Sequence, residues 1–320
     1  MKTETQYLYV ESKTKAEYLE LLREANLPQL EVTENKSLAN ILLVGPPMIA
    51  DKIDEFPNLK WVQSVYAGVD ALTQPGLRRD YLLTNVKGIF GQPISEYVLG
   101  YAIEHYRHFD IYREQQSAQN WQPHPYVCLN EKTLVILGTG SIGAHLSITA
   151  KAFGLKTIGV NSSGKQPANS QFDEVYAIQD IDKALAEADI LVSVLPKTPQ
   201  TKGILNAETF SHCKDVLLFN VGRGDAIETQ ALLDGLDNGQ VKRAYLDVFI
   251  NEPISQQCPY WQHPQVTVTP HIAAHSFPSQ VMGLFKQNYA KWLKGEELDA
   301  KVDFDKAIKQ KRLPREAFSN

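Results

Sequence analysis

The chain has 320 residues, and this length favours two domains, because a single hydrophobic core seldom grows beyond about 250–300 residues. Its hydrophobic share of 43% and charged share of 22% are typical of a soluble globular protein, and no apolar run approaches the roughly 18 residues of a membrane span. The formal net charge of −5 argues against a nucleic-acid-binding protein, because no basic surplus exists to neutralise phosphates.

The first hundred residues alternate short apolar runs with segments of helical spacing. The pattern predicts a helix at KTKAEYLELLREAN (13–26) and strands at QYLYVES (6–12), ANILLVGPP (39–47) and LKWVQSVYAGVD (59–70). Strands that alternate with helices indicate βαβ units and a parallel sheet. A long segment of helical spacing then covers 92–121, and a helix of this length often crosses between domains.

From residue 132 the alternation restarts with shorter strands that are apolar on both faces, as a sheet covered by helices on two sides requires. The predicted strands are KTLVILG (132–138), LKTIGVN (155–161), ADILVSVLP (188–196), DVLLFNVG (215–222), RAYLDVF (243–249) and VTVTP (266–270). The last segment, 284–304, looks like a helix followed by a chain that packs back on the first domain. The pattern predicts an α/β protein with doubly wound parallel sheets.

The clearest local signal is a glycine turn between a strand and a helix. Gly138, Gly140 and Gly143 have the spacing G-x-G-x-x-G. In dinucleotide-binding folds the first glycine allows the tight turn, the second lets the backbone approach the pyrophosphate, and the third lets helix and strand pack closely. The amides of Ser141 and Ile142 are expected to face the phosphates from the helix N-terminus. The segment predicts a dinucleotide site, and the alternative is an ordinary glycine-rich turn.

The end of the next strand indicates which dinucleotide is bound. An NAD enzyme usually carries Asp or Glu there for the ribose 2′-hydroxyl, and NSSGK (161–165) contains no carboxylate. Asn161, Ser162, Ser163 and Lys165 are therefore expected to accept a 2′-phosphate, although the usual arginine is absent. The pattern favours NADP(H) over NAD(H), and the alternative is a solvated polar turn.

Four charged or ionisable residues follow three further strands. Arg223 lies between two glycines after one apolar strand, Asp247 and Glu252 lie at and beyond the next, and His271 follows the last. In an open α/β sheet, ligands bind beyond the carboxyl ends of the strands. Arg223, Glu252 and His271 are therefore expected to converge on one side of one sheet.

These stretches resemble the D-isomer-specific 2-hydroxyacid dehydrogenases, in particular the glyoxylate/hydroxypyruvate reductase branch. The resemblance spans nearly the whole chain and is carried by SVYAGVD, GTGSIG, LPKTPQTKGILN, NVGRGDAIE, LDVFINEP and PYWQHPQVTVTPHIAA. It implies two Rossmann-like or flavodoxin-like domains with the active site in the cleft between them. The substrate domain is expected at 1–98 and 285–320, and the Rossmann domain, which binds the nicotinamide dinucleotide, at 99–284.

The resemblance implies an enzyme that reduces a small 2-keto acid to the D-2-hydroxy acid by hydride transfer from NAD(P)H. Arg223 is expected to bind the substrate, because its planar guanidinium matches a carboxylate and a keto oxygen. His271 is the expected proton donor, since a histidine can hold or release a proton near neutral pH. Glu252 would fix the tautomer of that imidazole, and the turn at Ala67 and Gly68 would offer backbone amides to the substrate carboxylate.

The same resemblance assigns contacts to the cofactor and a partner. Val221 and Asp247 would hold the nicotinamide, with Asp247 on its carboxamide, and Leu195, Pro196 and Thr201 would border the adenosine. A homodimer is expected, through the crossing helix of the cofactor domain and the loops beside it. The chain shows no secretory signal, and Cys128, Cys213 and Cys258 lack paired spacing, so a reducing, cytoplasmic location is expected.

A second histidine raises the alternative of a metal site. His271 and His275 are four residues apart, a spacing at which a helix can bind a metal, but no third ligand at a recognised zinc spacing is found. No metal is expected, and His275 is predicted to lie one helical turn from His271 without a catalytic role.

Two other functions stay open on the sequence. One is reduction of a larger 2-keto acid, of the D-lactate or phenylpyruvate type, because Tyr66 beside the carboxylate turn and Trp261 before the last strand can shape the pocket. The other is a non-catalytic NAD(H)-sensing protein, similar to the corepressors that share this fold. The presence of Arg223, Glu252 and His271 together favours an enzyme.

Overall fold

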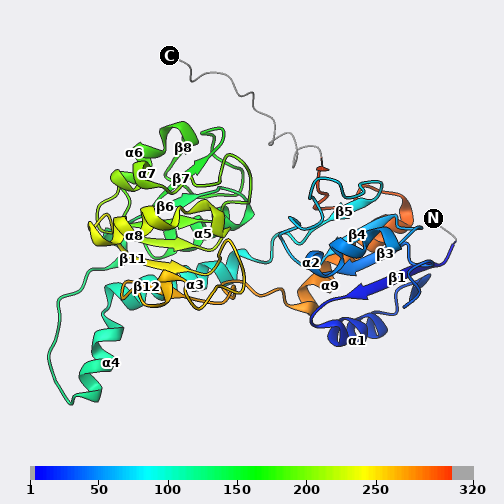
Figure 1. Cartoon of the computed structure of the whole chain (residues 1–320), viewed down its shortest axis with the longest axis horizontal. Helices are drawn as coiled ribbons and strands as arrows, with labels where there is room; N and C mark the ends of the chain where they lie inside the picture. The colour runs from blue at the N-terminus through cyan, green and yellow to red at the C-terminus, as the bar shows by residue number, and fades with distance from the viewer. Residues whose placement is uncertain (1–3, 305–320) are drawn as a thin grey trace. The chain divides into compact units, whose positions relative to one another are not determined.

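The computed structural model describes residues 4–304, which form two compact units (Figure 1). Of the described residues, unit 1 contains 4–89 and 276–304, and unit 2 contains 90–275. The chain passes from one unit to the other just before each of two long helices, α3 (Gly91–Tyr106) and α9 (Pro278–Lys294). The domain limits predicted from the sequence, at 98/99 and 284/285, fall within these helices.

Unit 1 is built on a five-stranded parallel sheet in the order β2-β1-β3-β4-β5. Its strands are β1 (Gln6–Glu11), β2 (Leu30–Val32), β3 (Ile41–Val44), β4 (Trp61–Ser64) and β5 (Leu82–Thr84). Its helices are α1 (Lys15–Ala25), α2 (Pro46–Ile49), the 3-10 helix η1 (Ala50–Glu55) and α9 (Pro278–Lys294). This strand order is the flavodoxin-like one, so the prediction for this part of the chain is confirmed.

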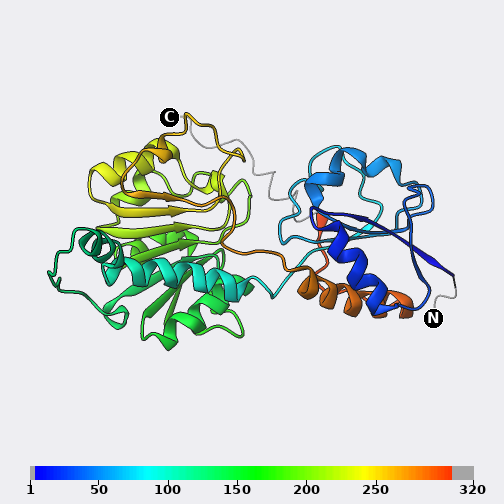
Figure 2. The ribbon, with the colours of Figure 1, turned by 90° about the horizontal axis from the view of Figure 1, so that it is seen from below.

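Both faces of this sheet are covered, and every residue of its strands β3 and β4 is buried. Leu42, Val44 and Val62 face a cluster that includes Phe56 after η1. On the other face Trp61 stacks on Phe285 of α9 at a centroid distance of 5.3 Å. The helices α1 and α9 contact each other and lie along the same face (Figure 2). The final helix thus completes the core of the N-terminal unit.

Unit 2 is built on a seven-stranded parallel sheet in the order β12-β11-β10-β9-β6-β7-β8. Its strands are β6 (Thr133–Leu137), β7 (Lys156–Asn161), β8 (Glu174–Ala177), β9 (Ile190–Ser193), β10 (Val216–Asn220), β11 (Val241–Leu246) and β12 (Val266–Val268). Its α-helices are α3 (Gly91–Tyr106), α4 (Phe109–Ser117), α5 (Ser141–Ala152), α6 (Ile181–Leu185), α7 (Ala207–Ser211) and α8 (Thr229–Asp237).

Short 3-10 helices complete unit 2: η2 (Leu129–Glu131), η3 (Ile178–Asp180), η4 (Gly224–Ala226) and η5 (Pro259–Trp261). The strand order is that of a Rossmann sheet, whose order reverses between β6 and β9. The prediction of doubly wound parallel sheets is therefore confirmed for both units. Among the described residues, no helix is long and apolar enough to cross a membrane.

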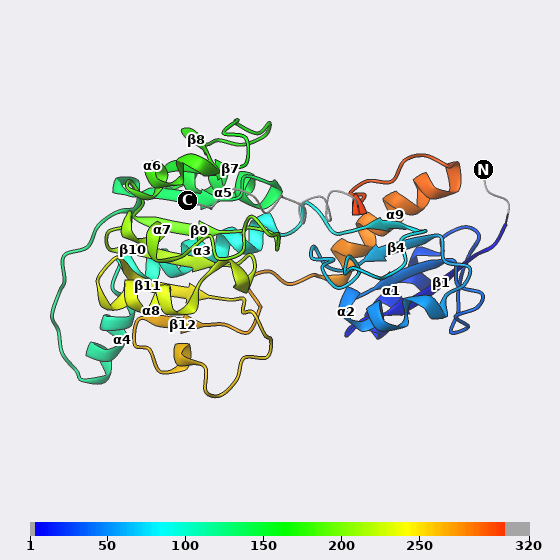
Figure 3. The same cartoon turned by 45° about the horizontal axis from the view of Figure 1, so that its top comes forward.

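The long helical segment predicted at 92–121 is interrupted. The helix α3 ends at Tyr106, and α4 begins at Phe109 after His108 adopts a left-handed conformation with φ of 57°. The helix α3 packs on α5, whereas none of the residues of α4 is buried. In two views, α4 and the chain after it extend away from the sheet of unit 2 (Figures 1 and 3).

Candidate active site

The glycine turn after β6 has the shape that a pyrophosphate requires. Gly138 has a φ of 101°, which favours glycine, and a Cβ on Gly143 would lie 2.0 Å from the carbonyl oxygen of Gly138. A Cβ on Gly140 would meet no atom within 4 Å, so the space beside this glycine is open. The helix α5 begins at Ser141 without a side-chain cap, which leaves the first amides, including that of Ile142, for an anion. These residues fit a dinucleotide.

The segment after β7 is organised by the side chain of Asn161. Its Oδ1 accepts hydrogen bonds from the amides of Ser163 (2.9 Å) and Gly164 (2.8 Å) and from the Ser163 hydroxyl (3.1 Å). Its Nδ2 donates to Thr139 Oγ1 (2.8 Å) and to the Lys165 carbonyl oxygen (2.9 Å). The two backbone amides fix the orientation of the Asn161 amide group. This side chain therefore shapes the loop and ties it to the glycine turn.

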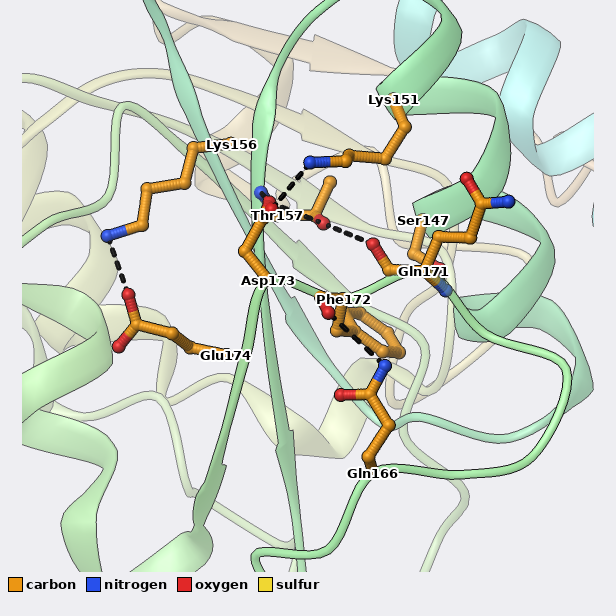
Figure 4. Close-up of polar contacts among 9 residues, drawn as sticks. All are labelled: Ser147, Lys151, Lys156, Thr157, Gln166, Gln171, Phe172, Asp173 and Glu174. Carbon is orange, nitrogen blue, oxygen red and sulfur yellow. Dashed lines mark hydrogen bonds and ion pairs between the residues drawn. The ribbon is translucent and has the colours of Figure 1, made fainter.

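Further polar contacts hold residues 166–173, which lead from this loop to β8, against α5 and β7 (Figure 4). Asp173 accepts from the Thr157 amide (2.7 Å) and pairs with Lys151 (2.5 Å). The Gln171 amide donates to Ser147 Oγ (3.1 Å), and Gln166 donates to the carbonyl oxygen of Phe172 (3.2 Å). Phe172 in turn packs close to Gly159 of β7. The segment 161–173 is therefore held to β7 and α5 along its length.

The hydroxyl of Thr201 joins the two ends of the loop after β9 (196–201). Thr201 Oγ1 donates to the Pro196 carbonyl oxygen (2.6 Å) and accepts from the Thr198 amide (3.0 Å). Leu195 is buried, and its backbone approaches Gly222, where a Cβ would lie 2.6 Å from it. The Val221 amide donates to the Ser193 carbonyl oxygen (3.1 Å), which continues the pairing of β9 with β10. Leu195 and Val221 thus belong to adjacent strand ends.

A His–Glu pair lies beyond the carboxyl ends of β11 and β12. His271 Nδ1 and Glu252 Oε2 are 2.7 Å apart, and the Phe249 amide donates to Glu252 Oε1 (2.9 Å). The side chain of His271 is 54% exposed and that of Glu252 is 35% exposed, so both remain accessible on unit 2. Because Nδ1 is occupied by the carboxylate, Nε2 is the nitrogen left to exchange a proton with a ligand.

The turn that carries Arg223 packs against the Glu252 loop through a glycine. A Cβ on Gly224 would lie 2.1 Å from the carbonyl carbon of Phe249, so only glycine fits this contact. The Arg223 guanidinium donates to the Gly222 carbonyl oxygen (2.8 Å), and Asn220 Nδ2 donates to the carbonyl oxygen of Arg223 (3.0 Å). The structure thus brings the arginine turn next to the loop that holds the His–Glu pair.

Unit 1 contains the predicted carboxylate turn. Ala67 and Gly68 follow β4, and Asn85 Nδ2 donates to the Ala67 carbonyl oxygen (2.7 Å). Ser64 Oγ accepts from the Tyr66 amide (3.0 Å) and donates to the Tyr66 carbonyl oxygen (2.8 Å). The ring of Tyr66 lies against Gly45, and burial raises the pKa of its hydroxyl. Two side chains that sequence reasoning missed, Ser64 and Asn85, therefore shape this turn.

The second histidine is not on a helix with the first. The segment 269–277, which includes His271 and His275, is irregular, so the prediction of a helical turn between them is wrong. The proline at 278 begins α9, and the preceding chain lacks helical hydrogen bonding. Within residues 4–304, no group of three or more metal-ligating side chains is present.

The fold and these loops define a nicotinamide-dependent oxidoreductase of the two-unit α/β class. A family model described as "D-isomer specific 2-hydroxyacid dehydrogenase, NAD binding domain" matches residues 99–273. A D-isomer specific 2-hydroxyacid dehydrogenase family protein from Aeromonas salmonicida subsp. salmonicida A449 is 44% identical, with 94% of this chain and 100% of that one covered and a TM-score of 0.89. The chain belongs to the D-isomer specific 2-hydroxyacid dehydrogenase family.

Two more distant structures carry cofactors. The NADPH-dependent glyoxylate/hydroxypyruvate reductase from Sinorhizobium meliloti, in complex with NADP and sulfate, is 28% identical, with 94% of this chain and 99% of that one covered and a TM-score of 0.84. A D-isomer specific 2-hydroxyacid dehydrogenase from Xanthobacter autotrophicus Py2, in complex with NADPH and MES, is 26% identical, with 95% and 99% covered and a TM-score of 0.85.

Proposed function

We propose that this protein reduces a small 2-keto acid of the glyoxylate or hydroxypyruvate type to the D-2-hydroxy acid. The observation that carries the proposal is the 2.7 Å bond between His271 and Glu252, on a loop that packs beside the Arg223 turn. An imidazole oriented by a carboxylate is the arrangement expected of a general acid. The similarity to the glyoxylate/hydroxypyruvate reductase from Sinorhizobium meliloti supports this substrate class.

Each side chain has one task in the proposed reaction. The planar guanidinium of Arg223 binds the substrate carboxylate and keto oxygen, which keeps the carbonyl in one orientation. His271 donates the proton from Nε2 to the keto oxygen, while Glu252 holds Nδ1 and fixes the tautomer. The amides of Ala67 and Gly68 bind the substrate carboxylate. When bound, the reduced nicotinamide supplies the hydride.

The cofactor contacts follow from the loops of unit 2. The amides at Gly140, Ser141 and Ile142 would hold the pyrophosphate at the start of α5, where Gly138 and Gly143 fix the turn. Val221 and Asp247 would border the nicotinamide, and Leu195, Pro196 and Thr201 the adenosine.

The proposed cofactor is NADP(H). The segment 161–165 contains no carboxylate that would repel a 2′-phosphate. Asn161 and Ser163 use their side chains to shape the loop, which leaves Ser162 and Lys165 as the proposed phosphate contacts. Two related proteins were solved with NADPH or NADP, which supports the same preference.

A homodimer in a reducing, cytoplasmic compartment is also proposed. The three cysteines are free thiols in the structure, with Cys213 buried. The surface that supports self-association is the exposed segment from α4 to Cys128, here called the arm (109–128). It exposes large apolar side chains, which are Phe109, Tyr112, Trp121, Tyr126 and Val127.

The proposal is tested by following NADPH and NADH absorbance with glyoxylate, hydroxypyruvate and phenylpyruvate. We expect the fastest oxidation with NADPH and one of the two small keto acids. Preferred use of phenylpyruvate would support the larger-substrate alternative. No oxidation with any of the three would contradict the enzymatic proposal and favour a cofactor-sensing protein.

The role of His271 is tested by His271→Ala. We expect turnover to fall by about 10²–10⁴-fold, the usual range for loss of a general acid, while the Kd for NADPH stays within about twofold. Turnover at the wild-type level in this variant would contradict the assignment of His271 as proton donor.

A further inference from the structure

One buried carboxylate organises the backbone on both sides of His271. Asp247 is 2% exposed. Its Oδ1 accepts from the Thr269 hydroxyl (2.6 Å) and from the Ile272 amide (2.8 Å), and its Oδ2 accepts from the Ala273 amide (3.0 Å). The His271 amide also donates to the backbone carbonyl oxygen of Asp247 (3.0 Å). The segment 269–273 is thus wrapped around this residue.

These hydrogen bonds stabilise a backbone conformation of His271 that is unfavourable by itself. His271 has a φ of 55°, in the left-handed region that costs a non-glycine residue about 1–2 kcal/mol. Such a conformation persists only when the surrounding structure determines it. The amides of His271, Ile272 and Ala273 all point at Asp247, and together they hold the backbone in this region. The direction of the His271 side chain toward Glu252 therefore depends on the position of Asp247.

Two hydroxyl groups connect Asp247 to α3. Thr269 Oγ1 donates its hydrogen to the carboxylate, so it can only accept from Tyr97 Oη, which lies 2.8 Å away. Burial raises the pKa of the Tyr97 hydroxyl, which remains a donor at any physiological pH. The Tyr97 ring packs edge-on against Tyr101, which lies against Tyr245. Tyr97, whose ring is fixed by its aromatic neighbours, therefore orients the Thr269 hydroxyl. That hydroxyl in turn orients the Asp247 carboxylate.

We propose that Tyr97 and Thr269 are positioning residues that act through Asp247 on the proton donor. The inference rests on the proposed role of His271 and adds two residues that touch neither substrate nor cofactor. A carboxylate accepts about four hydrogen bonds, and three are used within the protein. The remaining position on Oδ2 matches the single contact proposed with the nicotinamide carboxamide. Loss of the Thr269 hydroxyl would leave the Asp247 carboxylate held only by the amides of Ile272 and Ala273, and loss of the Tyr97 hydroxyl would leave that of Thr269 without its donor. In either case the direction of His271 would be less firmly fixed.

The test compares Tyr97→Phe, Thr269→Val and Thr269→Ser, with hydroxypyruvate, glyoxylate and NADPH as the probes. We expect kcat to fall about 5- to 20-fold in the first two variants, with KM for the keto acid within about twofold, because the imidazole acts on the transition state. Thr269→Ser keeps the hydroxyl and should restore kcat to within about twofold of wild type. In the His271→Ala background, Tyr97→Phe should cause no further loss.

The matched control is Tyr289→Phe in unit 1. Tyr289 is a buried tyrosine whose hydroxyl, like that of the half-buried Tyr97, makes one 2.8 Å hydrogen bond, here to the carbonyl oxygen of Pro28. We expect this variant to lose a similar amount of thermal stability and to keep wild-type kcat. Equal kcat values for Tyr97→Phe and Tyr289→Phe at equal loss of Tm would overturn the inference.

A spectroscopic readout separates this inference from the proposed function. The Nδ1 proton between His271 and Glu252 should give a downfield ¹H resonance that is absent in His271→Ala. We expect this signal to be lost or shifted in Thr269→Val and retained in Thr269→Ser, whether or not a substrate is found. If His271→Ala keeps full turnover, the proposed function fails. If His271→Ala loses turnover but Thr269→Val and Tyr97→Phe keep the wild-type signal and the wild-type kcat, the positioning role fails and the proposed function stands.

Discussion

At the scale of single residues, the loop after β7 shows how a polar sequence divides between structure and binding. Asn161 uses both its donors and its acceptor inside the loop, and the Ser163 hydroxyl bonds to Asn161 and accepts from the Lys165 amide. Among the described residues, no hydrogen bond or ion pair is present for the side chains of Ser162 and Lys165. The four polar residues therefore divide into two groups. The side chains of Asn161 and Ser163 form the loop, and those of Ser162 and Lys165 are left for the proposed contact with a phosphate.

Lys165→Met tests this division. We expect the Kd for NADPH to rise about 5- to 10-fold, because one exposed charge-assisted contact is lost, and the Kd for NADH to change less than twofold. Lys214→Met is the control for net charge, since Lys214 is an exposed lysine elsewhere in unit 2. Calorimetry with NADPH and NADH measures both. An equal loss for the two cofactors would show that Lys165 does not contact the 2′-phosphate.

Gly224 is a position at which any side chain would disturb the geometry of the site. A Cβ there would meet backbone atoms of Phe249 and Ile250 at 2.1 to 2.5 Å, and backbone cannot rotate away as a flexible side chain can. We expect Gly224→Ala to cost about 1–3 kcal/mol of stability and to lower kcat/KM at least tenfold, since the turns of Arg223 and Glu252 must separate.

The control for this substitution is Gly100→Ala. Gly100 lies on the exposed side of α3, where a Cβ meets nothing within 4 Å. Alanine there should stabilise the helix by about 0.5–1 kcal/mol and leave kcat/KM unchanged. Thermal unfolding and steady-state kinetics measure both effects. Wild-type activity in Gly224→Ala would show that the contact does not position the site.

At the scale of secondary-structure elements, most strands could be predicted, whereas the short edge strands β2, β5 and β8 could not. β6 and β10 are continuous apolar runs, and the structure confirms them. β2 (LEV) and β8 (EVYA) have no buried residue and are too short to show a hydrophobic period. The break after α3 was also missed, because helical spacing continues through His108 while its left-handed φ does not depend on that spacing.

The residues of the site also differ in whether the sequence alone can predict them. Arg223, Glu252 and His271 could be predicted, because residues after the carboxyl ends of parallel strands gather at one edge. Tyr97 could not, because its partner Thr269 is 172 residues away and Tyr97 belongs to no motif. A tyrosine at helical spacing in α3 has the sequence signal of an ordinary core residue. Only the packing of α3 beside the sheet brings the two hydroxyls together.

The last turn of α3 makes a pH-dependent contribution to stability. Burial, with the positive charges of Arg243 and Lys242, lowers the pKa of His105 to about 4. The unfolded chain therefore binds a proton between about pH 6.5 and pH 4 that the folded protein does not. The free energy of unfolding should be constant, as far as His105 is concerned, above pH 6.5 and should fall as the pH drops through this window.

Denaturant unfolding at several pH values measures this effect. We expect His105→Gln to remove about 1–3 kcal/mol of the fall between pH 6.5 and pH 4, reduced by partial solvent screening of the site. His212→Gln, at an exposed position, is the control and should keep the wild-type slope. An unchanged slope in His105→Gln would show that folding does not lower the pKa of this histidine.

At the scale of the whole molecule, the arm has no buried residue, although Asp110 at its start pairs with Arg243 of β11 (3.5 Å). His108 Nε2 and the carbonyl oxygen of Pro125 are 2.8 Å apart, and the His124 amide donates to the Tyr112 hydroxyl (2.9 Å). Arg107 stacks over the Tyr126 ring at 4.3 Å. These contacts cost conformational entropy, yet Trp121 beside them is 99% exposed. An ordered segment that leaves its largest apolar side chain in water is the expected form of an association surface.

Trp121→Ala tests whether that surface joins two copies of the chain. Buried tryptophans are among the side chains that contribute most to interfaces, and loss of one costs about 2 kcal/mol or more, so we expect the dimer dissociation constant to rise at least about 30-fold. Leu38→Ala removes an exposed apolar side chain of unit 1 and should leave the dimer intact. Sedimentation velocity over a range of protein concentrations measures both. A wild-type protein that remains monomeric at high concentration would contradict the proposed homodimer, whereas a dimer that tolerates Trp121→Ala would show that the copies associate through another surface.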